Sequence, residues 1–150
     1  MAVRPRRFWG WGREGEGPSA EQQQAIAQAL AARFGLDDVR ITPPPRIEEL
    51  TLPAPRVTPP PALAPVCSTD PVDRAGHAYG KAFRDVVRAL RREYSHPPDV
   101  VAFPRDEADV IAILDWCSRE RLACIPYGGG SSVVGGVEPR LDAGWRGAVS

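Results

Sequence analysis

The regular spacing of apolar residues predicts a helix over residues 19–34. Ser19 is a good N-cap, and Gln22 three residues later completes the pattern of a capping box. Gly35 supplies a stop signal at the C-terminal end. The apolar residues that repeat every four positions, and so form one stripe along this helix, are Ile26, Leu30 and Phe34.

A second helical segment is expected over residues 70–94. Asp70 can cap it and Pro71 suits the first helical position, whereas Gly76 and Gly80 weaken its first half and favour a break there. The residues of its apolar face are Tyr79, Phe83, Val87, Leu90 and Tyr94. The cationic residues near its start are Arg74, His77, Lys81 and Arg84. They form either a solvated side of the helix or a cationic patch for an anionic ligand.

Two short apolar runs with a helix between them predict a βαβ unit from Val100 to Tyr127. The first run, Val100–Phe103, is typical of a strand buried on both faces. Asp106 can cap the helix, expected from Glu107 to Glu120, and the second strand is Ala123–Ile125. We expect paired parallel strands with a right-handed crossover. The helix positions expected to face the sheet are Val110, Ile113, Leu114 and Cys117.

Two other segments are expected to be irregular. Proline dominates residues 42–65, which excludes a helix or a central strand and favours an extended strap or linker. Apolar residues spaced through it favour a strap on its own domain over a polyproline II ligand for another one; they are Leu50, Leu52, Val57 and Leu63. In residues 1–18, we expect the rings to dock on the body of the protein, or else to contact a ligand; they are Phe8, Trp9 and Trp11.

Composition excludes several classes of protein. The 150 residues carry 19 Lys+Arg and 19 Asp+Glu, and this zero net charge argues against a nucleic-acid module. No run approaches the roughly 18 apolar residues that span a bilayer. The Arg6-Arg7 pair lacks the apolar region of a signal peptide, so we expect a cytoplasmic protein. The three cysteines fit neither a disulfide scaffold nor a metal site and are expected to be reduced thiols; they are Cys67, Cys117 and Cys124.

The sequence PYGGGSSVVGG, from Pro126 to Gly136, carries the chemistry. Three consecutive glycines at a strand end remove every Cβ, so that backbone N–H groups can approach an anion closely. Ser131 and Ser132 add hydroxyl donors, and a diphosphate suits such a loop. It is not a Walker loop, and Val133 stands where the third glycine of a G-x-G-x-x-G fingerprint would be. On glycine content alone, a flexible turn between two strands is the alternative.

The segment HPPDVVAFPRDEADVIAILDWCSRERLACIPYGGGSSVVGG resembles the opening of the FAD-binding domain of the vanillyl-alcohol oxidase/p-cresol methylhydroxylase (PCMH) flavoproteins. From Pro98 to Gly136 it has that family's order of proline, short strand, proline, acidic helix start, strand and Gly-rich loop. The resemblance implies an α+β fold. A helical and Pro-rich N-terminal region is followed by the first βαβ unit of a PCMH-type FAD-binding domain, which is incomplete here.

Two upstream segments narrow the resemblance. RFWGWGREGEG near the start, and DRAGHAYGKAFRDVVRAL from Asp73 to Leu90, resemble the N-terminal region of alkyldihydroxyacetonephosphate synthases and their bacterial relatives. The implied organisation is an aromatic arm over residues 1–18, a helical region with the Pro-rich strap over 19–95, and the start of the FAD-binding domain over 96–150.

The resemblance also implies a cofactor and its site. FAD would be held through its diphosphate, mainly by backbone N–H groups, and the residues of this site are Pro126, Tyr127, Gly128, Gly129, Gly130, Ser131 and Ser132. In relatives that attach flavin covalently through this loop, a histidine follows the glycines. Ser131 holds that place here, so we expect non-covalent binding at this loop. Attachment from a later segment is left open.

Three functions are compatible with these features. The first is an ether-lipid synthase type of flavoenzyme, in which a fatty alcohol replaces an acyl group without net redox change. The second is an FAD-dependent oxidoreductase of a hydroxy acid or alcohol. The third is an inactive fragment or a partner-binding module. The enzymes would act on a small-molecule or lipid-like substrate, and a homodimer of the full-length form is left open. A strand is expected at Gly147–Ser150, and catalytic residues are expected beyond it.

Overall fold

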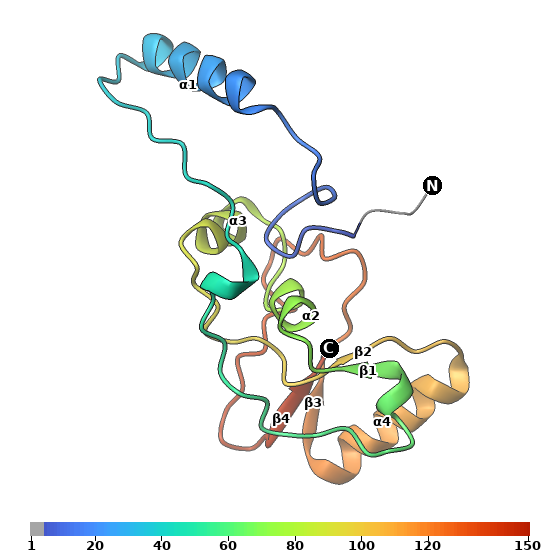
Figure 1. Ribbon diagram of the computed structural model, residues 1–150. Coiled ribbons are helices and arrows are strands. Elements are labelled where there is room, and N and C mark those ends of the chain that lie inside the picture. The colour runs from blue at the N-terminus through green and yellow to red at the C-terminus, as the bar shows by residue number, and fades with distance from the viewer. Residues whose placement is uncertain (1–4) are drawn as a thin grey trace. The chain divides into compact units, whose positions relative to one another are not determined.

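A computed structural model describes residues 5–150 and divides them into two compact units (Figure 1). One unit consists of the described residues up to 7 together with residues 11–44. The other consists of residues 8–10 and 45–150. The second unit holds the strands and the Gly-rich loop, so it is the unit that positions the site.

The first unit is built on helix α1, Ala20–Phe34, which confirms the first predicted helix. The Gln22 amide donates to Ser19 Oγ at 3.2 Å, the Ser19 amide donates to Gln22 Oε1 at 2.8 Å, and Gly35 ends the helix at φ 61°. The apolar stripe is not covered, since its members are largely exposed in the described chain; they are Ile26 (54%), Leu30 (44%) and Phe34 (64%).

The second unit has four short strands, which form two hydrogen-bonded pairs. They are β1 (Cys67–Ser68), β2 (Val101–Ala102), β3 (Leu122–Cys124) and β4 (Gly147–Val149). β1 pairs antiparallel with β2, and β3 pairs parallel with β4. A parallel bridge between Val100 and Val149 joins the two pairs, which gives the spatial order β1-β2-β4-β3. β4 confirms the strand expected at Gly147–Ser150.

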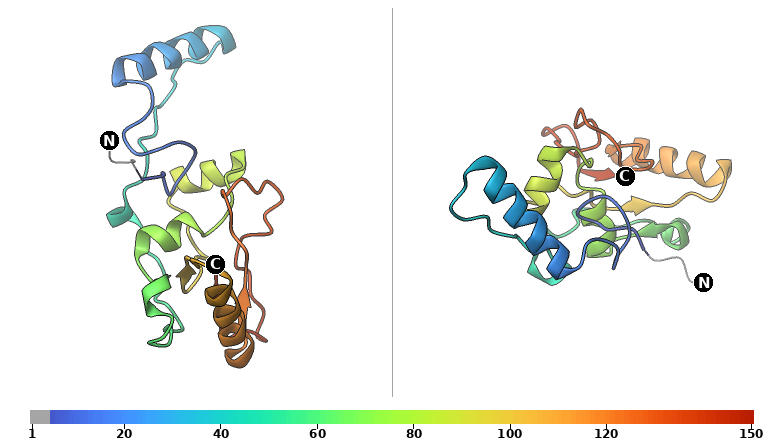
Figure 2. Two further views of the ribbon diagram at one scale, coloured as in Figure 1. Left: turned by 90° about the vertical axis from the view of Figure 1, so that its right-hand side faces the viewer. Right: turned by 90° about the horizontal axis from the view of Figure 1, so that it is seen from above.

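The βαβ prediction needs one correction. Helix α4, Glu107–Glu120, has the predicted bounds, and Figures 1 and 2 show it running alongside β3. The two predicted strands are not neighbours, however, because β4 lies between β2 and β3. A strand more than twenty residues downstream in the chain thus completes the sheet, and such long-range pairing leaves no local pattern in the sequence.

The buried face of α4 also differs from the expectation. Ile113 and Cys117 pack in the core as predicted, together with Trp116. Val110 and Leu114 were expected to face the sheet, but they are 41% and 50% exposed. Both line the open cavity described below, which also borders the strands, so they lie at the edge of a cavity rather than in the packed core.

The second helical segment is broken, as its glycines indicated. It forms α2 (Pro71–Gly76) and α3 (Phe83–Leu90), and Asp70 caps α2 by accepting a 2.8 Å hydrogen bond from the Val72 amide. The predicted continuous apolar face is wrong, since Phe83 is 86% exposed. Because the chain is not helical between Gly76 and Phe83, residues on the two sides of this break do not share one helical face. Tyr79 and Tyr94 are buried and stack on each other with ring centroids 5.1 Å apart.

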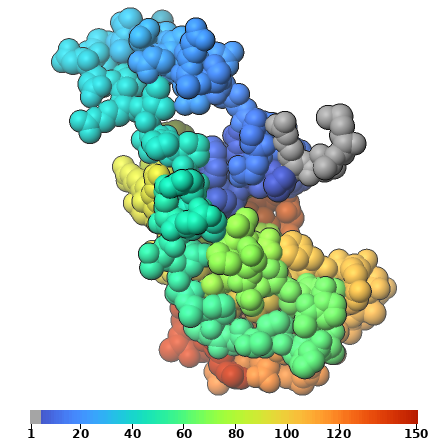
Figure 3. Space-filling model, in the orientation of Figure 1, coloured from blue at the N-terminus to red at the C-terminus, as the bar shows by residue number. Residues whose placement is uncertain are grey.

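The Pro-rich segment is a strap across the surface of the second unit (Figure 3). It contains two single 3₁₀ turns, Ile47–Glu49 and Ala64–Val66, which the proline content did not predict. The strap contributes apolar residues to two separate cores. The core under α4 comprises Leu63, Val66, Val100, Ile113, Trp116, Cys117, Leu122 and Val149. The core around α2 and α3 comprises Ala75, Ala78, Tyr79, Ala89 and Tyr94, flanked by Phe8, Trp9, Ile47, Leu50 and Leu52.

The aromatic residues near the start behave differently from one another. Phe8 and Trp9 pack against the core around α2 and α3, as expected for rings that dock on the protein. Trp11 is 56% exposed. Among residues 5–150, no helix combines the length and the hydrophobicity that crossing a bilayer requires.

Candidate functional site: the glycine-rich loop after β3

The Gly-rich loop begins at the carboxyl end of a parallel strand. β3 ends at Cys124, and the Ile125 amide still donates to the Val149 carbonyl of β4 at 2.8 Å. The chain then leaves the sheet at Pro126, and Ser150 follows the neighbouring end of β4. In open α/β sheets, ligands bind in the crevice outside the carboxyl ends of the strands, so the loop lies where a ligand is expected.

Tyr127 anchors the start of the loop. Its hydroxyl donates to the Gly76 carbonyl at 2.8 Å, and its ring stacks on His77 with centroids 4.0 Å apart and planes 20° from parallel. His77 Nδ1 also lies 2.9 Å from Ser150 Oγ. These contacts tie the loop to the segment after α2, so its first residue is fixed before any ligand binds.

Two glycines let the loop pack tightly against the protein. Gly130 has φ +72°, and a Cβ there would overlap the Tyr127 hydroxyl. Gly80, between α2 and α3, lies so close to the Ser132 carbonyl that a Cβ would overlap it. At both positions, a side chain would displace the loop from its seat.

The other side of the loop is open. A Cβ built on Gly128 or Gly129 would meet no atom within 4 Å. Within residues 5–150, the backbone N–H groups of Gly128, Gly129 and Ser131 donate to no protein acceptor. Neighbouring N–H groups without a protein partner, beside open space, are the arrangement that receives an anion.

A buried ion pair holds the far end of the loop. Glu138 is 8% exposed and accepts hydrogen bonds from Arg88 of α3, at 2.7 Å from Nη2 and 3.2 Å from Nη1. Burial alone would raise the pKa of Glu138, but the hydrogen bonds from Arg88 and Arg140 outweigh it and hold that pKa below its usual value. The loop is therefore fixed at both ends and open in the middle.

The four cationic residues near α2 do not act as one group, because Arg74 is buried and Arg84 is exposed. Arg74 is 4% exposed and donates to the Pro98 and Pro53 carbonyls, both at 2.8 Å, so it ties the strap to the sheet. Lys81 donates to the Phe8 carbonyl at 3.4 Å. Both of these cations serve packing. His77 contacts the start of the loop, whereas Arg84 is exposed and its guanidinium lies beside Gly135 at the far side of the loop.

Burial keeps the His77 ring neutral. Loss of hydration lowers its pKa to about 4. A histidine in the unfolded chain titrates near about 6.5, so the unfolded state binds more protons than the folded state between those two values. The folding stability that depends on neutral His77 is complete above about pH 6.5 and falls as the pH drops toward 4.

We therefore expect His77→Gln to flatten the pH dependence of stability. Gln cannot take up the proton but keeps a polar group near Ser150. Thermal unfolding followed by circular dichroism from pH 7 to pH 4 measures the effect. The melting temperature of the natural sequence should decline more steeply over this window than that of the variant. Parallel declines would show that His77 is not the group responsible.

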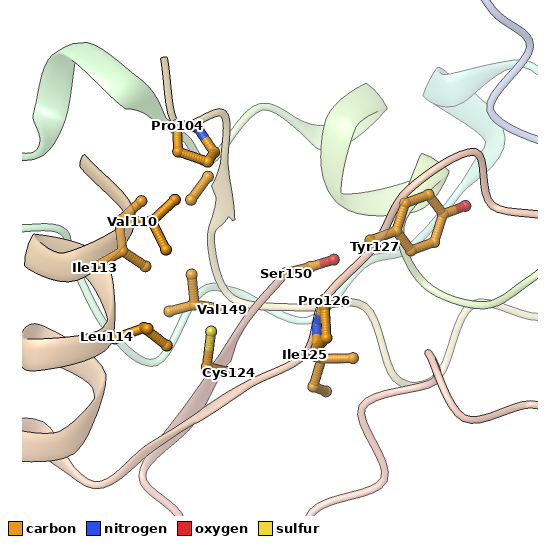
Figure 4. Close-up of a pocket in the computed structure, with 11 residues that line it drawn as sticks. Pro104, Val110, Ile113, Leu114, Cys124, Ile125, Pro126, Tyr127, Val149 and Ser150 are labelled. Carbon is orange, nitrogen blue, oxygen red and sulfur yellow. The ribbon is translucent and has the colours of Figure 1, made fainter. Parts of the chain in front are cut away.

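An apolar cavity of about 470 Å³ lies at the foot of the loop, between α4 and the carboxyl ends of β3 and β4 (Figure 4). Its lining residues are Ala102, Pro104, Val110, Ile113, Leu114, Cys124, Ile125, Pro126, Tyr127, Val149 and Ser150. The sequence did not predict it, because Val110 and Leu114 were assigned to the sheet-facing side of the helix. In the part of the chain that the structure describes, no cluster of side chains suits a metal ion.

Comparison with known proteins defines the class. Residues 98–144 match the family described as "FAD binding domain". The matched segment runs from just before β2 to just before β4, and its similarity to an FAD-binding domain supports FAD as the cofactor. The α+β fold and the cofactor predicted from the sequence are confirmed.

Particular relatives are alkyldihydroxyacetonephosphate synthases. The one from Trypanosoma brucei brucei is 37% identical over 70 residues, which are 47% of this chain and 11% of the relative. "Probable D-lactate dehydrogenase, mitochondrial" from Danio rerio is 49% identical over 41 residues, 27% of this chain and 8% of the relative. A solved alkyldihydroxyacetonephosphate synthase has the same fold, with a TM-score of 0.76 at 20% identity over 97% of this chain and 32% of the solved chain. The chain therefore spans about a tenth of these curated relatives.

Proposed function

We propose that residues Pro126–Ser132 hold the diphosphate of FAD. The observation that carries the proposal is the group of backbone N–H donors at Gly128, Gly129 and Ser131, which have no acceptor within the described residues, beside the open space around Gly128 and Gly129. A diphosphate offers several acceptor oxygens to such donors. The Ser132 hydroxyl lies next in the chain and can extend the row.

The residues around the loop have supporting roles in this proposal. Tyr127 and Gly130 fix the conformation in which the N–H groups are presented, and Gly80 gives the loop its seat. Donors that are positioned before binding lose little conformational freedom when the ligand arrives. When bound, FAD would supply an electrophilic flavin ring, and this loop contributes orientation of the cofactor rather than chemistry. With Ser131 after the glycines, the binding at this loop is non-covalent.

We further propose that the chain is part of a flavoenzyme of the alkylglycerone-phosphate synthase type, which makes ether lipids. Two similarities support this proposal. The identity to the Trypanosoma synthase extends over 70 residues, more than the 47 residues matched to the FAD-binding domain family, 98–144. The fold similarity to the solved synthase covers 97% of the chain, including the helical region before the sheet.

An FAD-dependent oxidoreductase of a hydroxy acid is the second candidate. Over shorter segments, the identity to D-lactate dehydrogenases is higher, 49% over 41 residues for the Danio rerio protein and 47% over 38 residues for the Arabidopsis thaliana one. Adding D-2-hydroxy acids to the flavin-loaded full-length protein separates the two candidates. Bleaching of the flavin absorbance would favour the oxidoreductase. Exchange of an acyl group for a fatty alcohol without bleaching would favour the synthase.

Titration of FAD into the purified 150-residue chain tests whether these residues form the whole FAD site or only part of it. We expect weak binding, with a dissociation constant above about 1 μM, because diphosphate contacts alone leave both ring systems of the cofactor without a buried surface. Quenching of flavin fluorescence measures it. Saturation below 1 μM with one FAD per chain would show that these residues form a complete site. No binding of FAD at millimolar concentration would favour the third function, a partner-binding module.

A further inference from the structure

Two thiols come together where α4 ends and β3 ends. Cys117 lies in the last turns of α4 and is 3% exposed, whereas Cys124 is the last residue of β3 and is exposed. Arg121 adopts φ 56°, which ends the helix and turns the chain back, so β3 runs alongside α4. Both thiols line one surface hollow together with Arg121 and Trp145. All three cysteines of the chain are free, and Cys67, in β1, packs against the core that contains Cys117.

The two thiols differ in acidity because they interact. A hydrogen bond from the Cys117 side chain stabilises the Cys124 thiolate and lowers the pKa of Cys124 to about 7. The same interaction, together with burial, raises the pKa of Cys117 well above its usual value. At neutral pH, about half of the exposed Cys124 is therefore thiolate, whereas Cys117 beside it is a protonated thiol. A thiolate next to a second thiol is the arrangement of reactive cysteine pairs.

The exposed Cys124 also lines the apolar cavity at the foot of the loop. Figure 4 shows the sulfur pointing into this cavity, near Leu114 and Val149. Small uncharged oxidants can enter such a space, whereas charged ones would lose hydration there.

We propose that Cys124 and Cys117 are a modification site, a dithiol that a hydroperoxide converts to a disulfide. The Cys124 thiolate attacks the terminal peroxide oxygen, an S–O bond forms, the O–O bond breaks, and the leaving alkoxide or hydroxide takes a proton from water. The Cys117 sulfur then attacks the Cys124 sulfur, an S–S bond forms, the S–O bond breaks, and water leaves with the Cys117 proton. The two thiols are oxidised by two electrons, and the peroxide is reduced.

The disulfide would link the end of α4 to the strand that leads into the glycine-rich loop. Only four residues separate Cys124 from Gly129, so the link would restrict the strand that carries the loop. The proposal does not depend on the function assigned to that loop, because neither oxidation step involves FAD.

Oxidation of the folded chain with hydrogen peroxide tests the proposal. Remaining thiols are alkylated, and trypsin then cuts after Arg119 and Arg121, which separates the two cysteines into different peptides. A disulfide therefore appears as two linked peptides, which a reducing agent separates by cleaving the S–S bond. We expect this pair to be the main product and to form at least about tenfold faster in the folded chain than in urea, because folding positions the thiols and lowers the pKa of one.

Single variants assign the roles. Cys117→Ser should stop at a sulfenic acid on Cys124, which dimedone traps. In Cys124→Ser, oxidation of the two remaining cysteines, Cys67 and Cys117, should be slower by about tenfold or more. Cys67→Ser is the matched control and should form the linked pair at the rate of the natural sequence. Linked peptides that contain Cys67, equal rates in urea and in the folded state, or unchanged oxidation of Cys117 in Cys124→Ser would each overturn the proposal.

Discussion

Gly129→Val is expected to abolish FAD binding while leaving the protein folded. A Cβ at this position meets no atom within 4 Å, and its φ is not in the left-handed region, so the substitution disturbs no contact of the described chain. The branched side chain would instead occupy the space in front of the free N–H groups, where the diphosphate would lie. A loss of about 3 kcal/mol, or about 100-fold in affinity, is the expected scale. Flavin absorbance retained after gel filtration of the full-length protein measures it.

Two further variants make this result specific. Gly130→Val should also lose FAD, but for another reason, because a side chain there overlaps Tyr127 and requires an unfavourable φ of +72°. It should therefore lower the melting temperature, which Gly129→Val should not. Ser131→Ala should cost only about 1 kcal/mol, the value of one hydrogen bond. Full flavin retention by the Gly129→Val protein would exclude the loop as the diphosphate site.

Asp99→Ala is expected to have the largest effect on stability. Asp99 is 2% exposed and lies just before β2. Its carboxylate accepts hydrogen bonds from Arg56 of the strap, 2.8 Å from N and 2.7 Å from Nη2, and from the Ala148 amide of β4 at 2.7 Å. The side chain thus joins the strap to the strand beside the loop. Its removal leaves the buried Ala148 amide without this acceptor, which costs about 3 kcal/mol or more.

Thermal and urea unfolding of the 150 residues measure this loss. At this chain length, 3 kcal/mol corresponds to a fall of about 10 °C in melting temperature. Asp115→Ala is the control, because Asp115 is exposed on the same unit. It should change stability by less than about 0.5 kcal/mol. An equal effect of the two substitutions would mean that the Asp99 network does not hold the strap to the sheet.

The same network makes the folding stability depend on the ionisation of Asp99 at acid pH. Burial alone would raise the pKa of Asp99, but hydrogen bonds from Arg56 and the Ala148 amide outweigh it and hold that pKa below its usual value. A carboxylate whose pKa is depressed by folding stabilises the protein above its unfolded pKa, near about 3.9, and loses this contribution as the pH falls through the folded value. The loss therefore lies at lower pH than the one assigned to His77.

Local rules account for what the sequence predicted well. Ser19, Asp70 and Asp106 each cap a helix where expected, because a capping bond involves residues only two or three positions apart. The bounds of α4 follow from such a cap and from the apolar period. β2, β3 and β4 were placed to within about two residues, whereas β1 was not predicted.

Long-range contacts account for what the sequence missed. No pattern near Val100 indicates that β4 separates it from β3. Tyr127 and His77 are fifty residues apart in the chain, so their stacking had no local signal. The glycines of the loop looked equivalent in sequence. Only the fold separates Gly130, which packs against Tyr127, from Gly129, which faces open space.

Amide chemical shifts of the labelled chain test the central claim most directly, since they detect weak binding residue by residue. FAD, ADP and riboflavin are titrated separately, because ADP has the diphosphate without the flavin ring and riboflavin has the ring without phosphate. If the loop holds the diphosphate, FAD and ADP will both move the amide resonances of Gly128, Gly129 and Ser131, and riboflavin will leave them in place. Resonances of the loop that move equally with riboflavin, or that stay fixed while FAD moves others, would contradict the assignment.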